Sequence, residues 1–145
     1  MRAGSTRAVG YAAGGIEAHA HIAQESSSGL MSADDYHSGS VSAAFGGNTS
    51  LIPFAAQHLG ETVDQVLSSY DARAAPNAVL DCSYHLIISD PTPEVLTDGL
   101  PRAFARGITS FKVFMTYDLL NLGDDGMLAI LAVARQHGAL TMVHA

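Results

Sequence analysis

The chain has 145 residues, of which 48% are hydrophobic and 14% are charged, and its formal net charge is −7. This length and apolar content suit one compact domain with a hydrophobic core. The negative charge argues against a nucleic-acid partner and against an anionic membrane surface, because both are bound through basic patches. A single cysteine, Cys82, cannot form an internal disulfide, so we expect a reducing compartment, the cytoplasm.

Short apolar segments rich in strand-forming residues alternate with helical stretches along the chain. The predicted strands span residues 15–22, 49–55, 79–89, 108–117 and 139–144. The predicted helices span residues 33–45, 62–75, 93–106 and 125–137. Strand centres recur about every 30 residues, which is the size of a βα unit. Apolar strands between helices predict an α/β fold with a parallel sheet covered on both faces.

The ends and faces of the predicted helices carry further signals. Gly107 and Gly138 each follow a helix and precede a strand, where a left-handed C-cap is expected. The last helix has a stripe at i, i+3, i+4 and i+7, formed by Leu128, Leu131, Ala132 and Arg135. Arg135 falls in the last turn, where a cation suits the helix dipole.

Several polar residues have a structural explanation. Asp34 and Asp35 follow Ser32, which predicts an N-cap serine and an acidic first helical turn. Residues 90–93 predict a turn that leads into a helix. We expect His85 to lie in the core, although it could face a site, and we expect three other histidines at the surface: His37, His58 and His137.

Two architectures fit five βα units. One is a complete five-stranded doubly wound domain, and the other is the first five strands of an eight-stranded barrel. A doubly wound nucleotide binder has a glycine-rich phosphate loop after its first strand, whereas the first predicted strand here ends in HAH followed by IAQESSSG. The sequence also ends at a predicted strand with no closing helix. Both features favour the barrel.

Histidines lie at the ends of two predicted strands. His19 and His21 form an H-x-H pair at the end of the first, and residues i and i+2 of a strand point the same way, so two imidazoles can bind one cation. His144 lies at the end of the fifth. In barrels the carboxyl ends of the strands carry the chemistry. A lone histidine on a strand is more often packed or capped than bound to a metal. The position of His144 at the carboxyl end of a strand is what favours a role as a metal ligand.

Lys112 is the only lysine in the chain, and it lies within the apolar run ITSFKVFMTY, residues 108–117. A lysine that reaches the edge of the sheet is the ordinary explanation. Apolar Phe111, Val113 and Phe114 make that explanation weaker. A buried lysine must be neutral, paired with an acid, or chemically changed. Reaction of the neutral amine with CO2 gives a carbamate, an anion able to bridge two metals.

Three motifs resemble those of the cyclic amidohydrolases, in the dihydropyrimidinase and D-hydantoinase group. GGIEAHAH, residues 14–21, is similar to the GGID-x-H-x-H motif that opens the barrel of that group. TSFKVFMTY, residues 109–117, resembles its carboxylated-lysine strand, and TMVHA, residues 141–145, its next metal-histidine strand. The segment SADDYHSGSVSAAFGGNTSLIPFA, residues 32–55, also resembles the family. The resemblance implies a TIM-like (β/α)8 barrel with an added β-sandwich and two divalent metals, usually zinc.

The resemblance also implies roles for individual residues. His19 and His21 would hold the more buried metal, Lys112 as N6-carboxylysine would bridge both, and His144 would bind the second. Tyr117 would be both catalytic and substrate-binding, because it matches the tyrosine that hydrogen-bonds the substrate carbonyl and its developing oxyanion. The implied reaction is hydrolysis of a cyclic amide, a dihydropyrimidine or hydantoin, to an N-carbamoyl amino acid. The implied full-length assembly is a homo-oligomer, a dimer or tetramer.

The sequence departs from the family pattern in two ways. Glu17 stands where the family usually has Asp. A further metal histidine from the sixth strand and an aspartate from the eighth have no counterpart before Ala145. We therefore expect residues 14–145 to be the first part of the barrel, residues 1–13 to be a short remnant, and the sandwich and the rest of the barrel to be absent. We expect this fragment to be inactive by itself.

Other functions stay open. Allantoinase and dihydroorotase are alternative hydrolases, because this part of the chain does not fix the ring substrate. A non-catalytic dihydropyrimidinase-like scaffold is an alternative of another class. The retention of the four predicted metal ligands argues against the scaffold, which needs none of them.

Overall fold

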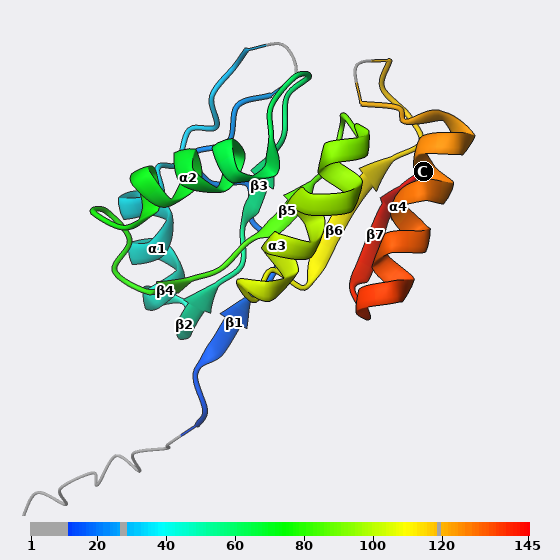
Figure 1. The fold of residues 1–145 in the computed structure, drawn as a ribbon. Helices are drawn as coiled ribbons and strands as arrows, with labels where there is room; N and C mark the ends of the chain where they lie inside the picture. The colour runs from blue at the N-terminus through cyan, green and yellow to red at the C-terminus, as the bar shows by residue number, and fades with distance from the viewer. Residues whose placement is uncertain (1–11, 27–28, 119) are drawn as a thin grey trace, which may run out of the picture.

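The computed structural model describes residues 12–26, 29–118 and 120–145 (Figure 1). The strands are β1 Gly15–Glu17, β2 Asn48–Leu51, β3 Phe54–Ala56, β4 Asp81–Cys82, β5 His85–Ile87, β6 Ser110–Phe114 and β7 Leu140–His144. The helices are α1 Tyr36–Phe45, α2 Val63–Ala74, α3 Leu100–Ala105 and α4 Gly123–His137, with a π-helical turn, η1 Val95–Gly99, before α3. The predicted alternation of strands and helices is confirmed. The predicted N-terminal remnant lies, up to residue 11, outside the described residues.

All of the strand pairs are parallel, in two sheets with the orders β1-β2-β4 and β3-β5-β6-β7. The predicted strands at 49–55 and 79–89 are each broken into two short strands. The register is the same on both sides of the break, since Leu51 pairs with Cys82 and Phe54 pairs with His85. Pro53 lies at the break, and proline has no N–H for the ladder. The two sheets therefore continue in the same direction and register across this break.

The order of the strands follows the order of the chain. β1 lies beside β2, the β2/β3 strand beside the β4/β5 strand, and then come β6 and β7. A doubly wound domain reverses its strand order near the middle of the sheet. The described strands show no such reversal, so the order does not support the doubly wound alternative.

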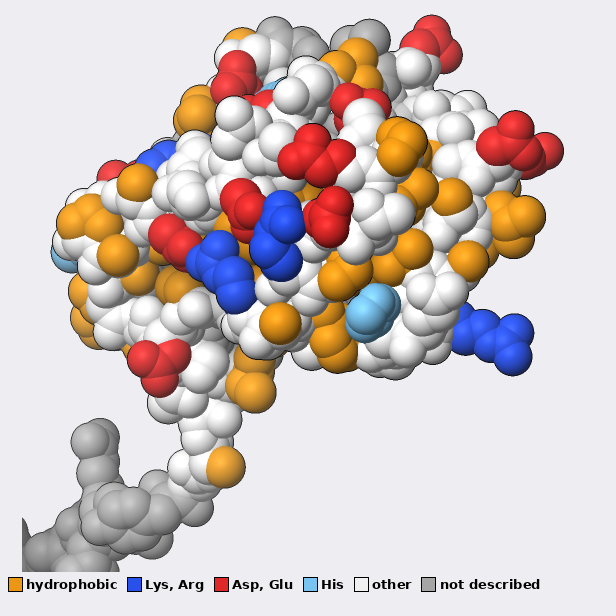
Figure 2. All heavy atoms as spheres, viewed as in Figure 1, with side chains coloured by type: hydrophobic (Ala, Val, Ile, Leu, Met, Phe, Trp, Pro, Cys, Tyr) orange, Lys and Arg blue, Asp and Glu red, His pale blue; other side chains and the backbone are white. Residues whose placement is uncertain are grey.

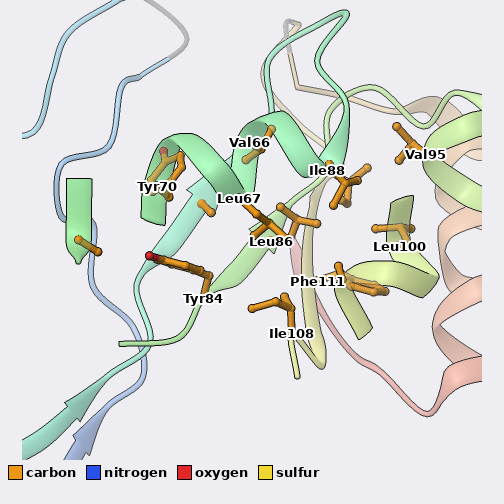
Figure 3. Packing of buried hydrophobic residues seen from close by; sticks show 14 of the residues in the cluster. Val66, Leu67, Tyr70, Tyr84, Leu86, Ile88, Val95, Leu100, Ile108 and Phe111 are labelled. Atoms are coloured by element: carbon orange, nitrogen blue, oxygen red, sulfur yellow. The ribbon is translucent and has the colours of Figure 1, made fainter. Parts of the chain in front are cut away.

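The main hydrophobic core lies between the strands and the helices. Figure 3 shows Leu67 of α2 and Leu100 of α3 packed toward Leu86, Ile88 and Phe111. These side chains are almost fully buried. Burial of a leucine or phenylalanine of this kind contributes about 1.5–3 kcal/mol per side chain.

The opposite face of the sheet has a smaller apolar cluster and no helix of the described residues against it. Its buried members are Phe54, Ala56, Ile87 and Phe114, all from strands. The prediction that helices cover both faces is therefore wrong for the described part of the chain. This second face, called the open face below, also carries Lys112, because successive residues of a strand alternate between faces.

The predicted stripe on α4 is not the side that packs. Leu128 is 68% exposed and Leu131 is 40% exposed, whereas Ile130 and Ala134 are buried. The helix has apolar residues on more than one side, and the sheet selects the side of Ile130. Arg135 does lie in the last turn, and Gly138 adopts the left-handed C-cap with φ 68°.

The start of α1 also corrects a prediction. Its N-cap is Asp35, not Ser32, and the Asp35 carboxylate accepts a hydrogen bond from Ser38 N at 2.7 Å. Thr92 behaves as predicted, since its hydroxyl accepts from Val95 N at 3.2 Å where the next helix begins. His37 and His58 are exposed as predicted, but His137 is half-buried and its ring lies 5.5 Å from that of Phe104.

The surface viewed in Figure 2 shows basic side chains beside acidic ones. Arg102 pairs with Asp64 at 2.9 Å, and Arg106 pairs with Asp71 at 2.7 Å. These side chains are about half exposed, so each pair contributes only about 0–1 kcal/mol. None of the described helices combines the length and apolar character needed to span a membrane.

We predict that the 145-residue chain associates through β7. Among the described residues this strand pairs only with β6, and Leu140 and Val143 are 63% and 47% exposed. An unpaired apolar edge is a template for pairing with another chain. Sedimentation at increasing concentration should show association that Val143→Lys reduces and Leu30→Lys, a matched change in a distant loop, does not. A monodisperse monomer with a cooperative melt would contradict this expectation.

Candidate metal centre

The H-x-H segment follows β1 but is not part of it. The predicted strand at 15–22 ends at Glu17, and the segment continues along the neighbouring strand through a bond from Phe54 N to Ala20 O at 3.3 Å. The Glu17 carboxylate accepts a hydrogen bond from His19 N at 2.9 Å. The rings of His19 and His21 are edge to face, with centroids 5.7 Å apart. The two imidazoles are thus neighbours, as predicted, although irregular backbone holds them.

Phe54 of β3 is fully buried and lies under both imidazoles. The His21 ring stacks on it at 4.8 Å between centroids and 17° between planes. The His19 ring meets it at 4.8 Å and 71°. The ring of His85, from β5, lies 5.2 Å away. Phe54 therefore supports both imidazole rings and restricts their orientation above β3.

Lys112 of β6 is 7% exposed and points to the open face. Its Nζ lies 4.8 Å from the centroid of Phe54 and 5.4 Å from that of Phe114. Among the described residues it forms no hydrogen bond and no ion pair. An ammonium with three donors is costly to bury without acceptors. The sequence-based expectation of a buried lysine is confirmed.

The ring of Phe114 contacts two other predicted site residues, Tyr117 and His144. His144 of β7 stacks on Phe114 with centroids 5.3 Å apart, and Tyr117 lies 5.3 Å from His144. Lys112 Nζ contacts Phe54 on one side and Phe114 on the other. Lys112 is thus within reach of the ring that supports the His19–His21 pair and of the ring that stacks on His144.

The neighbouring charged residues change the pKa of His19. Partial desolvation, followed by the positive charges of Lys112 and His21, lowers the pKa of His19. Glu17 opposes this shift. A lowered pKa leaves the imidazole neutral at neutral pH, and the neutral ring is the form that binds a metal.

The donors suit a transition metal only if Lys112 is modified. Among the described residues no group of three or more His, Cys, Asp and Glu side chains is placed to hold a metal. The imidazoles of His19, His21 and His144 are ligands for zinc, but an ammonium is not. A carbamate on Lys112 would add two oxygen donors between them. The buried amine with no acceptor is the observation that fits this modification.

A pocket of about 480 Å³ opens beside these residues on the same face. It is lined by Gln24, Glu25, Ser26, Ala56, Gln57, His58, Leu59, Ile87, Ser89, Phe114, Tyr117 and Leu120. Gln57 is buried, and its amide oxygen accepts from Ser89 N at 3.1 Å and from Asp90 N at 3.0 Å. These bonds join the carboxyl ends of β3 and β5. The pocket thus has apolar walls with a rigid polar edge.

Tyr117 lies in the turn after β6 and lines the pocket. Its backbone is left-handed, with φ 64°, which costs a non-glycine residue of order 1–3 kcal/mol. Its carbonyl accepts from Leu120 N at 2.7 Å and from Asn121 N at 2.9 Å. The residue is 59% exposed, so a ligand in the pocket can reach it.

The sequence did not single out the residues that support the site. Phe54 and Phe114 gather the ligands, and Gln57 orders the pocket edge. His58, predicted to be at the surface only, also lines the pocket. The available signal was period-2 spacing, which places Phe114 on the same face as Lys112. Nothing in the sequence shows that Phe54 lies under the H-x-H pair.

Comparisons with known proteins agree with this arrangement. The chain is 42% identical, over 134 residues, to the D-hydantoinase of Geobacillus stearothermophilus, and 33% identical to the dihydropyrimidinase of Rattus norvegicus. The predicted resemblance is confirmed. Each match covers 91% of this chain, but only 28% and 25% of those relatives. No family model matches the chain.

Solved structures give the same relation. A D-hydantoinase crystal structure superposes with a TM-score of 0.84 at 39% sequence identity. The match covers 91% of this chain and 29% of the D-hydantoinase chain. The dihydropyrimidinase from Brevibacillus agri also gives 0.84, at 36% identity and the same coverage. The chain therefore has the fold of about three-tenths of a hydantoinase, with parallel α/β structure throughout. The relation to hydantoinases is shown, and the roles of individual site residues stay predictions.

We predict that the charge of Lys112, after desolvation, contributes to the lowered pKa of His19. In metal-free and CO2-free protein, His19 should titrate below the ordinary value of about 6.5 in an NMR experiment. Lys112→Met should raise the pKa of His19, because it removes the charge that opposes the imidazolium. Arg135→Met, a change at an exposed and distant cation, should leave it unchanged. An unaltered His19 titration in Lys112→Met would contradict the geometry.

Proposed function

We propose that the protein carrying this sequence hydrolyses a cyclic amide, a hydantoin or dihydropyrimidine, to an N-carbamoyl amino acid. The chain spans less than a third of the relatives it matches, so the proposal concerns a protein larger than these 145 residues. The observation that carries it is Lys112 Nζ, buried between Phe54 and Phe114 with a predicted metal histidine beside each ring. Similarity to D-hydantoinases and dihydropyrimidinase supports the substrate class.

We infer that the described strands form part of a (β/α)8 barrel. Parallel strands in chain order, with helices against one face, are what a barrel wall has. The open face then becomes the barrel interior, and the carboxyl ends of the strands hold the site. In this proposal residues 14–145 supply the first five βα units.

The metal ligands proposed from this chain are His19 and His21 for one cation and His144 for the other, with Lys112 between them. The two cations, zinc in our proposal, would activate water and polarise the ring carbonyl. A histidine and an aspartate from elsewhere in the protein would complete the set.

Carboxylation of Lys112 resolves the cost of its burial. The ammonium first loses one proton, the lone pair of the neutral amine then forms an N–C bond to CO2, and a second proton leaves the nitrogen to give a carbamate anion. No oxidant or reductant is involved. The change turns a buried cation without acceptors into an anion with cationic partners, which is a favourable exchange in an apolar setting.

Tyr117 and the pocket would act on the substrate. The Tyr117 hydroxyl donates a hydrogen bond to the ring carbonyl, and this bond strengthens as negative charge develops on the oxygen. The apolar wall formed by Ile87, Phe114 and Leu120 would receive the substituent of the ring.

A non-catalytic scaffold is the less favoured function. A scaffold has no use for a lysine buried without an acceptor, and the cost of that burial would remain uncompensated. Allantoinase and dihydroorotase chemistry would use the same ligands, and turnover of allantoin or dihydroorotate in place of a hydantoin would indicate them. We also infer a cytoplasmic location from the single Cys82, and a homo-oligomeric full-length assembly, a dimer or tetramer, from the resemblance to the hydantoinase group.

The first prediction from this proposal concerns the paired histidines. In the full-length protein, His19→Ala and His21→Ala should each lower bound zinc and reduce hydantoin turnover by several orders of magnitude, because both bind one cation. Metal analysis by mass spectrometry and a ring-opening assay measure the two effects. His37→Ala, at an exposed histidine outside the site, is the control. Unchanged metal content in both site variants would overturn the assignment.

The second concerns Lys112. Lys112→Ala should lose most of one metal and nearly all activity, and Lys112→Arg should not recover either, because a guanidinium stays charged and repels cations. Propionate, with bicarbonate as a second trial, should partly restore Lys112→Ala by supplying a carboxylate in the vacated space. Full activity of Lys112→Arg would show that this lysine is an ordinary buried cation.

A further inference from the structure

The segment that carries His19 and His21 has one backbone carbonyl held by a distant side chain. The carbonyl belongs to Ala18, directly before His19, and it lies 2.8 Å from His85 Nε2. His85 is on β5 and is 7% exposed. A buried side chain of another strand therefore sets where the metal-ligand segment begins.

The partners of His85 fix its tautomer. A carbonyl only accepts, so Nε2 must carry the proton and donate it to Ala18 O. In a neutral ring Nδ1 is then the acceptor, and it receives the hydroxyl proton of Ser110. Both ring nitrogens therefore have a partner, one on the segment before His19 and one on β6.

The hydrogen bond between His85 and Ser110 connects β5 to β6, the strand that carries Lys112. Ser110 precedes Lys112 by two residues on β6, so both side chains lie on the open face. The ring of His85 also lies against Phe54, which supports the two imidazoles. Through Ala18 on one side and Ser110 on the other, His85 connects the two parts of the candidate metal centre.

We propose that His85 is a positioning residue that sets the distance and angle between the His19–His21 pair and Lys112. The proposal rests on the metal-binding function argued above and adds to it a residue that touches no metal. Residues that orient metal ligands in this way usually change metal affinity by about 10–100-fold when they are replaced. A role in packing alone would change stability without changing the geometry around the metal.

The test uses the full-length protein, freed of metal and reloaded with Co²⁺ in the presence of bicarbonate. His85→Leu keeps the volume and removes both hydrogen bonds, and His85→Gln keeps a donor to Ala18 O. Ser40→Ala is the matched control, because Ser40 is buried and accepts from Val79 N at 3.0 Å but lies outside the open face. The readouts are Co²⁺ affinity, the visible absorption spectrum and thermal unfolding without metal.

We expect His85→Leu to weaken Co²⁺ binding about 10–100-fold and to shift the visible spectrum, and His85→Gln to restore most of both. Ser110→Ala should give a smaller change in the same direction. Ser40→Ala should lower the unfolding temperature and leave affinity and spectrum unchanged. Wild-type affinity and spectrum in His85→Leu, or equal losses in His85→Leu and Ser40→Ala, would overturn the proposal. His19→Ala separates the two claims: if it keeps its Co²⁺, the metal centre itself is wrong, and if it loses Co²⁺ while His85→Leu does not, only the role of His85 is wrong.

Discussion

The burial of Lys112 between two aromatic rings is the constraint on which the rest of the site depends. Contact between an ammonium and an aromatic ring contributes about 0.5–2 kcal/mol. The penalty for taking an ion out of water is several kcal/mol even after relaxation. Two rings therefore do not compensate the burial of an unpaired ammonium. In the proposed function, a chemical change that makes the nitrogen part of an anion, with cations bound beside it, would remove the deficit and give the lysine a function.

Lys112 is buried in this way because the two faces of the sheet have different surroundings. One face packs against helices and forms the main core, with Phe111 and Val113 of β6 pointing into it. Lys112 alternates with them and so must point to the other face. There the strand breaks near Pro53 bring Phe54 under the histidine pair, and β7 brings His144 to Phe114. The alternation of side chains along β6 thus places Phe111 and Val113 in the core and Lys112 at the candidate site.

The sequence predicted the elements well and their details less well. Periodicity and glycine C-caps located the helices to within a few residues, because these signals are local. The breaks in two strands were missed, although Pro53 was a visible sign of one. The packed side of α4 was predicted wrongly, because Leu128 and Leu131 are as apolar as Ile130 and only the position of the sheet selects among them. The motif residues came from family resemblance, whereas Phe54 and His85 depend on contacts between distant strands that no local pattern encodes.

The central claim is that Lys112 carries a carbamate in the functional protein. The most direct measurement is carbon-13 NMR of the full-length, metal-loaded protein after equilibration with labelled bicarbonate. The account predicts one protein-bound carbamate carbon that is present in the wild type, absent in Lys112→Ala, and lost when metal is removed and the sample is acidified. A wild-type protein with full metal content and full activity but no such resonance would contradict the account.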